Sequence, residues 1–178
     1  MERKVVWGSP FRWVVPADYE DWLEDMARQG WHPEPVGQWS SLRMVFTRGE
    51  PQKMRYVYDM NAFPKADYVE TYRQFGWEPV GQMASCFLWR RAYDGPRPEA
   101  FTDPASVRAR NRRVRNAVVL VFVLFALEVA ASIFGAGRNF IRGEWLDGLS
   151  FAGQVVLFGA FTVYLGWVVR QIQRNLNR

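Results

Sequence analysis

The residue types that carry most enzyme chemistry are nearly absent from this chain of 178 residues. It contains one histidine, His32, and one cysteine, Cys86. A zinc site needs several cysteine, histidine or carboxylate ligands at regular spacing, which these two residues cannot supply. Nucleophilic catalysis would have to use His32, which lies between Trp31 and Pro33 just after a predicted helix end, as a turn histidine does.

Phosphate and cation binding have no clear signature either. A phosphate-binding loop needs clustered glycines, and those of the N-terminal half stand singly at positions such as Gly8, Gly30, Gly37 and Gly49. The acidic run Glu20, Asp21, Glu24 and Asp25 could hold a hard cation, but helical carboxylates without a ligand loop usually form a solvated face. We therefore predict that the protein is not an enzyme and has no catalytic, metal-binding or cofactor-binding residues.

Glu128 is the charged residue whose position in the sequence costs the most free energy. It is the single charged residue of an apolar segment over residues 117–136, while a second apolar segment, residues 150–169, has none. A carboxylate in the middle of a membrane span costs about 2.5–3.5 kcal/mol on insertion scales, so it should be protonated, paired or facing protein. Counted by depth, Glu128 lies between the levels of Gln154 and Thr162. Either a proton or cation site or a structural hydrogen bond between neighbouring helices would fit.

The two apolar segments are predicted membrane spans, since each has the roughly 20 residues that a helix needs to cross the hydrocarbon core. Basic residues concentrate beside them: residues 1–103 hold 13 Lys and Arg against 15 Asp and Glu, and residues 104–178 hold 10 against 3. An excess of arginine at both outer flanks predicts a multi-pass protein of the cell membrane with both termini in the cytoplasm. The first flank contributes Arg108, Arg110, Arg112, Arg113 and Arg115.

These arginines allow a second interpretation, because a basic cluster can also bind nucleic acid. The cluster lies within a few residues of a span and has no interleaved aromatic side chains. We therefore favour a role in topology and in contacts with anionic lipid, and expect no direct binding of nucleic acid.

The predicted organisation has six segments. Residues 1–95 form a cytoplasmic α+β repeat domain, 96–116 a linker and basic juxtamembrane helix, 117–136 the first span, 137–149 a short external loop, 150–169 the second span and 170–178 a cytoplasmic tail. Small residues recur at seven-residue spacing on the second span, and such a stripe lets helices approach closely. It could contact the first span or a second copy in a homo-oligomer, and it consists of Ala152, Gly159 and Gly166.

The N-terminal domain contains an internal repeat. Three motifs occur twice in the same order: Ala-Asp-Tyr at residues 17–19 and 66–68, Gly-Trp at 30–31 and 76–77, and Pro-Val-Gly-Gln at 35–38 and 79–82. In each unit an apolar helix face follows Asp-Tyr, and the glycine of Gly-Trp stands where a left-handed helix end is expected. Strands are predicted over residues 11–15, 44–47, 55–58 and 87–93, with a further strand after each Gly-Trp.

This order predicts an α+β fold. Two β-α-β-β units would form a ferredoxin-like antiparallel sheet with two helices on one face, followed by two transmembrane helices. The domain has more large aromatic residues than one such core requires. We therefore expect an exposed aromatic surface that binds a protein, peptide or apolar ligand, with Trp13, Trp39 and Trp89 as candidates.

These motifs resemble a bacterial family known as domain of unknown function 2812. The resemblance rests on Asp18-Tyr19, the helix with Trp22-Leu23 and Met26-Ala27, Gly30-Trp31, and residues 101–103 leading into basic residues and spans. It covers about the first 115 residues. Members commonly carry C-terminal spans, and their genes often neighbour PadR-type transcriptional regulators. The resemblance thus implies a membrane-linked regulatory role, a possible PadR-type partner and no catalytic residues.

We therefore expect a membrane-anchored cytoplasmic binding module, a sensor or regulatory accessory protein that acts through protein or ligand contacts without a cofactor. The alternative is a small subunit of a membrane transport or efflux assembly that uses Glu128 in the first span.

Overall fold

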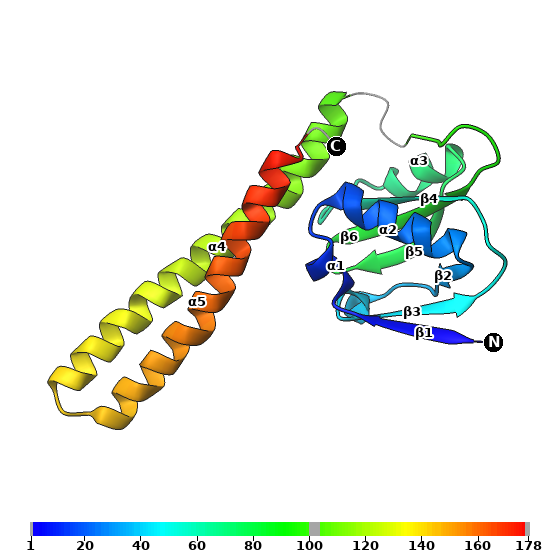
Figure 1. The fold of residues 1–178 in the computed structure, drawn as a ribbon. Coiled ribbons are helices and arrows are strands. Elements are labelled where there is room, and N and C mark those ends of the chain that lie inside the picture. Colours follow the sequence, from blue (N-terminus) through cyan, green and yellow to red (C-terminus); the bar gives the residue numbers. More distant parts are fainter. Residues whose placement is uncertain (1, 100–103, 177–178) are drawn as a thin grey trace. The chain divides into compact units, whose positions relative to one another are not determined.

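The computed structural model describes residues 2–99 and 104–176 (Figure 1). The chain divides into two compact units, one formed by residues up to Asn111 and the other by Arg112–Leu176. The first contains an α+β domain and the second consists of two long helices. Residues 101–103, which contribute to the family resemblance, lie outside the described part of the chain.

The first half of the domain forms a three-stranded antiparallel sheet in the order β1-β3-β2. Trp7 of the first strand is paired with Arg43 of the third, and Pro33 of the second with Phe46 of the third. The elements are β1 (Arg3–Trp7), α1 (Ser9–Arg12), α2 (Pro16–Arg28), β2 (Trp31–Pro33), the 3₁₀ helix η1 (Gln38–Ser41) and β3 (Arg43–Arg48).

The first strand of the domain, β1, lies at different residues from the strand that the sequence pattern predicts. A strand was predicted over residues 11–15, but Phe11 lies in the short helix α1 and β1 precedes it. Prolines explain the difference: Pro10 stands in the first turn of α1 and Pro16 opens α2, so the chain between them is too short and too constrained for a strand. β1 itself is exposed at nearly every position, so it lacks the alternation that marks a half-buried strand.

The second half forms another three-stranded antiparallel sheet in the order β4-β6-β5. Its strands at residues 54–60 and 86–92 confirm the predicted ones. Gly30 and Gly76 have φ of 79° and 77°, so the predicted left-handed helix ends are also confirmed. The elements are β4 (Met54–Met60), α3 (Tyr68–Gln74), β5 (Glu78–Met83) and β6 (Cys86–Ala92).

The two Pro-Val-Gly-Gln motifs meet where the sheets adjoin. Val36 forms a parallel bridge with Gly81, and its backbone N–H donates to the Val80 carbonyl oxygen at 3.0 Å. Gly81 has φ 144°, and a Cβ atom at that position would collide with the Val36 carbonyl. The α+β class is confirmed, but the strands form two sheets joined by this bridge instead of one ferredoxin-like sheet.

The helices α2 and α3 pack on opposite faces of the second sheet, whereas the sequence pattern predicts two helices on one face. Tyr56 and Leu88 belong to the core around α2, whereas Val57 and Trp89 belong to a smaller core around α3. Successive residues of a strand point to opposite faces, so α2 and α3 cover different sides. The main core combines Tyr19, Leu23 and Met26 of α2 with Met44 and Phe46 of β3 and Val80 of β5.

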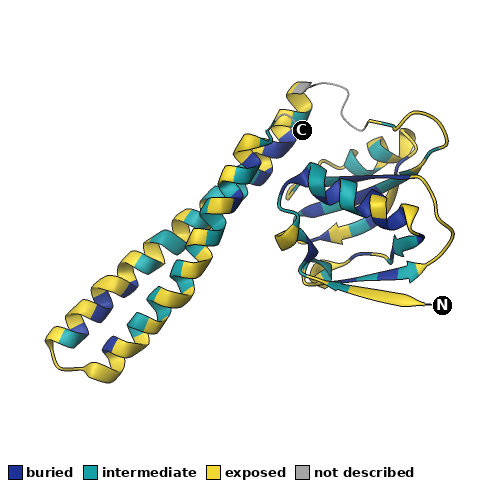
Figure 2. Cartoon of the chain, in the orientation of Figure 1, coloured by how far each residue is buried: buried dark blue, intermediate teal, exposed yellow. Residues whose placement is uncertain are grey.

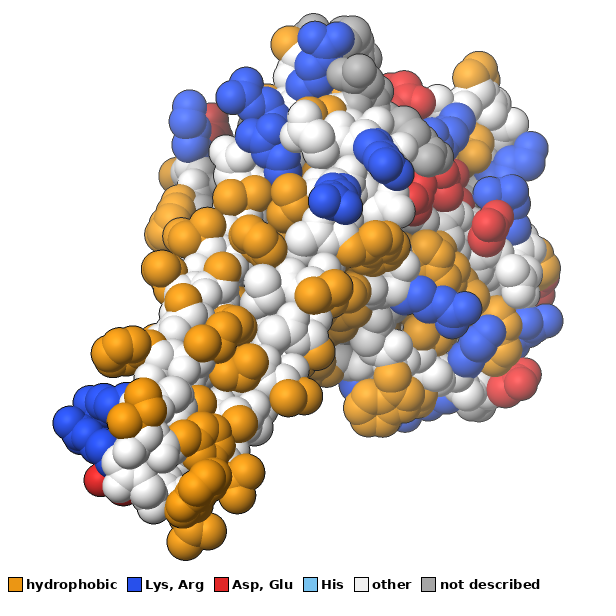
Figure 3. Space-filling view, turned by 60° about the vertical axis from the view of Figure 1, so that its left-hand side comes forward, with side chains coloured by type: hydrophobic (Ala, Val, Ile, Leu, Met, Phe, Trp, Pro, Cys, Tyr) orange, Lys and Arg blue, Asp and Glu red, His pale blue; other side chains and the backbone are white. Residues whose placement is uncertain are grey.

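The helical unit consists mainly of α4 (Pro104–Ile141) and α5 (Trp145–Arg174), which only residues 142–144 connect. Both helices are long and apolar enough to cross a membrane, and only 6% of the most apolar stretch of each is buried. Figure 2 shows them exposed or half-buried over most of their length, and Figure 3 shows hydrophobic side chains along them with Lys and Arg toward the ends. Such exposed apolar helices are compatible with a membrane protein.

Candidate functional sites

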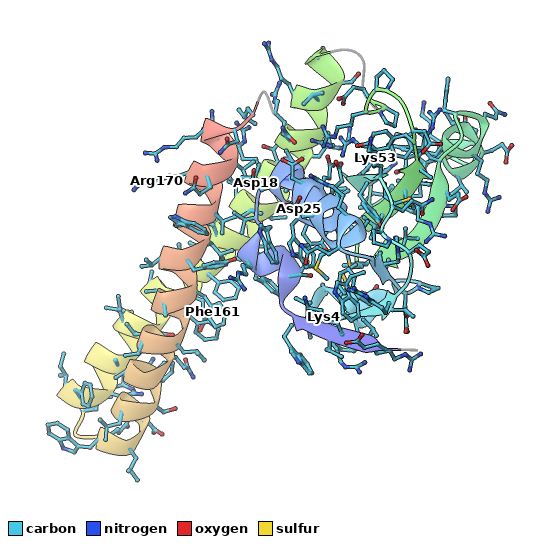
Figure 4. The ribbon with its side chains drawn as sticks, turned by 45° about the vertical axis from the view of Figure 1, so that its right-hand side comes forward. Lys4, Asp18, Asp25, Lys53, Phe161 and Arg170 are labelled. Atoms are coloured by element: carbon cyan, nitrogen blue, oxygen red, sulfur yellow. The ribbon has the colours of Figure 1, made fainter. Side chains whose placement is uncertain are left out.

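Two glutamates of α2 are buried against the second sheet. The Glu20 and Glu24 side chains are 2% and 6% exposed, and both accept hydrogen bonds from Arg55 of β4. Arg55 Nη2 lies 3.1 Å from Glu20 Oε2, and its Nη1 lies 2.9 Å from Glu24 Oε1. The predicted solvated acidic face is therefore wrong for these two residues. It holds for Asp25, which pairs with Arg28 on the surface; Figure 4 labels Asp25 on α2.

Two further arginines complete this arrangement. Arg110, in the second turn of α4, donates from Nη1 to Glu20 Oε1 at 2.7 Å, and its side chain is 4% exposed. Arg97, after β6, donates to both oxygens of Glu24 and to Asp21 Oδ1 at 2.9–3.1 Å. We call the six side chains the charge cluster: Glu20, Asp21, Glu24, Arg55, Arg97 and Arg110.

The charge cluster also covers the free edge of β4. This strand pairs with β6 on one side only, so its other backbone groups need partners. The Tyr58 N–H donates to Glu20 Oε1 at 3.0 Å, and Arg55 Nη1 donates to the Tyr56 carbonyl oxygen. Burial raises the pKa of the Glu20 carboxyl, while Arg110, Arg55 and this N–H oppose the shift by stabilising the charged form.

The other arginines of the first flank differ from Arg110. Arg108, Arg112 and Arg113 are exposed, and Arg115 Nη1 donates to Gln173 Oε1 of α5 at 2.8 Å. Arg110 is thus engaged within the domain unit, whereas lipid contact by the others stays a prediction. Sequence spacing could not separate Arg110 from its neighbours, because its partner Glu20 is 90 residues away.

The three candidate tryptophans of the aromatic surface lie in different environments. Trp89 is wrong as a surface residue, because it is fully buried, stacks on Tyr72 at a centroid distance of 4.4 Å and donates from Nε1 to Tyr68 Oη. Trp13 is half-buried and stacks on Trp22 at 4.2 Å. Trp39 of η1 is 76% exposed, so of the three it is the clear surface residue.

Trp39 has exposed apolar neighbours that are distant in the sequence. Gly8 donates its N–H to the Leu42 carbonyl oxygen at 2.8 Å, and Leu42 donates to the Trp39 carbonyl oxygen at 3.0 Å. Trp7 precedes Gly8, and the Phe11 ring lies over that glycine. We call this surface the aromatic rim; its members Trp7, Phe11, Trp39 and Leu42 are 71%, 53%, 76% and 46% exposed.

A buried carboxylate lies on the α3 side of the second sheet. Asp59 of β4 is 3% exposed, and its Oδ2 accepts hydrogen bonds from the hydroxyls of Tyr68 at 2.9 Å and Tyr72 at 3.4 Å. Burial, and then the charge of Asp59, raise the pKa of both phenols. The two tyrosines also line a pocket of about 320 Å³ beside Phe63, which is 93% exposed. The pocket could receive a small polar or aromatic group.

In the structure, Ser132 joins Glu128 and Gln154 in the predicted intramembrane site, and Thr162 does not take part. Ser132, one helical turn after Glu128, has its Oγ 3.2 Å from Glu128 Oε1 and 3.2 Å from Gln154 Oε1. Thr162 instead donates to the Phe158 carbonyl oxygen of its own helix. A serine hydroxyl has one proton, so Ser132 can donate to only one of these two oxygens at a time, and the side-chain amide of Gln154 can also donate to it. The i,i+4 spacing of Glu128 and Ser132 is a sequence signal for this contact.

The small-residue stripe of α5 does not show one common environment. Gly166 faces the Phe122 ring, with 3.4 Å between that ring and an added Cβ, whereas a Cβ added at Gly159 would have no described atom within 4 Å apart from its chain neighbours and its own helix backbone. Aromatic rings of the opposite helix lie closer at two other glycines: a Cβ added at Gly135 would be 2.9 Å from the Phe151 ring, and one added at Gly148 would be 2.6 Å from the Phe140 ring. A contact of Ala152, Gly159 and Gly166 with a second copy stays a prediction.

Among residues 2–99 and 104–176, no three His, Cys, Asp or Glu side chains come together where they could hold a metal ion. A family model described as protein of unknown function (DUF2812) matches residues 16–123. The chain belongs to this family. The DUF2812 match begins at α2 and ends within α4, so it includes the whole charge cluster and leaves out β1, α1 and α5. No curated protein and no solved structure gives a significant match.

Proposed function

We propose that this DUF2812 protein is a membrane-anchored cytoplasmic regulatory module, a sensor or accessory protein that acts through contacts with another protein and catalyses no reaction. The observation that carries the proposal is the ion pair between Glu20 and Arg110. It attaches the start of α4 to α2 within one compact unit. From Arg110 the helix continues without interruption to Ile141.

This connection gives a physical route for regulation. A partner that shifts α2 or the edge of β4 would change the surroundings of Glu20, and Arg110 would have to follow or lose a buried charge partner. Because α4 is one helix, a displacement of its first turns is carried into the apolar segment. By linkage, the state of the apolar helices would in turn alter the affinity for the partner.

The domain architecture supports a binding role. Both sheets place the third strand of their unit between the first and second strands, and both units carry the same three motifs. This agreement supports the interpretation of an internal duplication. With the arginine excess at the outer flanks, the domain and both termini would face the cytoplasm. The family resemblance makes a PadR-type regulator the first candidate partner; any DNA contact would belong to that partner.

Photo-crosslinking in cells tests the proposal. A photoreactive amino acid replaces Phe63, which is exposed beside the α3 pocket. The substitution is made in the full chain with no other change, with Arg110→Ala, or with Arg112→Ala. Mass spectrometry identifies the captured protein. We expect one defined regulatory protein, with a yield that changes several-fold in Arg110→Ala and stays unchanged in Arg112→Ala, an exposed neighbour. Capture of only copies of this chain, or a yield unaffected by Arg110→Ala, would overturn the proposal.

A second candidate function rests on the polar contact of Glu128, Ser132 and Gln154. A small subunit of a transport or efflux assembly could use Glu128 as a proton-carrying group, and an oligomer would be needed because two helices cannot enclose a pathway. In this case Glu128→Gln should abolish proton-dependent transport while Thr162→Val leaves it intact. If assembly and all membrane phenotypes are unchanged by Glu128→Gln, the transport function is excluded.

A further inference from the structure

The aromatic rim has a composition that is unusual for an exposed surface. Its four members come from two segments that lie side by side, the end of β1 with α1 and the stretch from η1 to the start of β3. Trp7 and Trp39 are more than two-thirds exposed, which leaves large apolar rings in water. Contiguous exposed apolar side chains on a protein surface generally mark an interaction site.

The charged side chains of the two segments that form the aromatic rim are all basic. Residues 7–13 and 37–43 contain no aspartate or glutamate, and each segment contains one arginine, Arg12 and Arg43. Arg43 lies opposite Trp7 in the β1–β3 pair and shares a hollow of about 300 Å³ with Trp39. The carboxylate in that hollow, Glu34, is already bound to Arg3 at 2.8 Å and to the Thr47 hydroxyl. The two segments therefore offer apolar rings and guanidinium groups, and the neighbouring Glu34 charge is balanced by Arg3.

We propose that the aromatic rim docks on the bilayer surface, with its rings at the level of the lipid headgroups and Arg12 and Arg43 on anionic lipid phosphates. Tryptophan prefers the membrane interface because its ring is apolar while its N–H can bond to water or headgroups. Arginine adds bidentate pairing with phosphate. Phe11 and Leu42 supply apolar area that can enter the boundary between headgroups and acyl chains.

The anchoring of the chain favours lipid over a soluble partner. The domain is joined to α4 and α5, which are apolar enough to cross a membrane, so the bilayer is always present at high effective concentration. A weak interfacial surface, too small to recruit a soluble protein to lipid, is then sufficient to hold the domain in one orientation. The inference rests on the membrane anchorage of the proposed function but not on a protein partner.

Spin-label accessibility in nanodiscs tests the docking. The full chain, at one copy per disc, carries a nitroxide at Gln38→Cys beside Trp39 or, as the matched reporter, at Lys65→Cys near α3. Both positions are exposed, whereas the native Cys86 is buried and should not react. Discs contain phosphatidylcholine with or without phosphatidylglycerol. Collisions with oxygen, which concentrates in lipid, are compared with collisions with a water-soluble nickel chelate.

We expect the label at position 38 to be several-fold less accessible to the nickel chelate than the label at position 65 in discs with phosphatidylglycerol. Replacing Trp7 and Trp39 with serine should restore its accessibility, and replacing Arg12 and Arg43 with glutamine should remove the effect of the anionic lipid. Equal accessibility at the two positions would overturn the docking. Protection that requires a second copy per disc would overturn it in favour of a dimer interface. No partner protein is present, so either failure leaves the capture experiment from Phe63 untouched.

Discussion

Glu20 and Arg110 lie 90 residues apart in the sequence, and their side chains meet at 2.7 Å with less than 5% of either exposed. Glu20 accepts in addition from Arg55 and from the backbone of Tyr58. Both carboxylate oxygens therefore have donors, which is the condition under which a buried charge is tolerated. One carboxylate thereby connects α2, the edge of β4 and the beginning of α4.

The first prediction concerns this carboxylate. Glu20→Gln should lower the free energy of unfolding of the domain by about 3 kcal/mol, because the buried Arg110 guanidinium loses the negative charge of Glu20. Asp25→Asn is the matched control on the same helix, since the Asp25–Arg28 pair is 58% exposed on both sides. The control should change stability by no more than about 0.5 kcal/mol. Urea unfolding of the full chain in detergent, followed by near-ultraviolet circular dichroism, measures both; equal effects would contradict the role of Glu20.

The second prediction compares equivalent glycines of the two Pro-Val-Gly-Gln motifs. Gly81→Ala should destabilise the domain by at least about 2 kcal/mol, because φ is 144° and the new Cβ would meet the Val36 carbonyl. Gly37 has φ −131° and open space around it, so Gly37→Ala should be tolerated within about 1 kcal/mol. Thermal unfolding of both variants measures the difference. A Gly81→Ala protein as stable as wild type would show that the Val36–Gly81 bridge does not require glycine at this position.

The third prediction concerns the two apolar helices. Ser132→Ala should weaken the association of α4 and α5 by about 0.6 kcal/mol, the average for hydrogen bonds between membrane helices, because it removes the contact to Gln154. Thr162→Val should have a smaller effect on association, since Thr162 bonds within its own helix. Steric trapping of the full chain in bicelles can measure these differences. A double-mutant cycle with Gln154→Leu should return a coupling energy for Ser132 and none for Thr162.

The fourth prediction concerns Cys86 and pH. Burial raises the pKa of its thiol from the usual 9.0 to about 11, so the folded state favours the protonated thiol. The resulting stabilisation is fully present below pH 9 and is lost as pH rises through about 11. A shift of this size corresponds to roughly 3 kcal/mol.

Urea unfolding from pH 8 to 11 should therefore show a steeper loss of stability for wild type than for Cys86→Ala. The comparison removes the contribution of tyrosines that ionise in the same range. Alkylation by iodoacetamide at pH 8 should be slow in the folded chain and fast in urea. Parallel pH profiles of the two proteins would show that Cys86 is not responsible.

Local signals were sufficient for much of the fold. The strands near residues 54–60 and 86–92, both left-handed glycines and both apolar helices follow from alternation, helix-end chemistry and span length. β1 and α1 did not follow, because β1 is exposed along its length and Pro10 reshapes the segment after it. The arrangement as two sheets depends on one backbone bridge between Val36 and Gly81, for which a sequence has no local signal.

The sites were less predictable, because their residues are recruited from distant positions. Glu20 and Glu24 have the spacing of a solvated helix face, and only Arg55, Arg97 and Arg110 make them interior residues. Trp39 and Trp89 are indistinguishable by type, yet one is exposed and the other fully buried. A weak clue existed on α2, where Ala27 continues the stripe of Glu20 and Glu24 into the core.

The contacts of Glu20 and Arg55 with the backbone of β4 bear on how the protein would fail when damaged. Their side-chain atoms occupy hydrogen-bonding positions that a strand from another molecule would need for pairing with β4. A variant that releases α2 would therefore expose the unpaired edge of β4, beside apolar core residues, to pairing with a strand of another molecule. Such variants should be lost from cells as aggregates or proteolytic fragments before any regulatory defect can be observed, so a null phenotype at Glu20 has to be accompanied by a measurement of protein abundance.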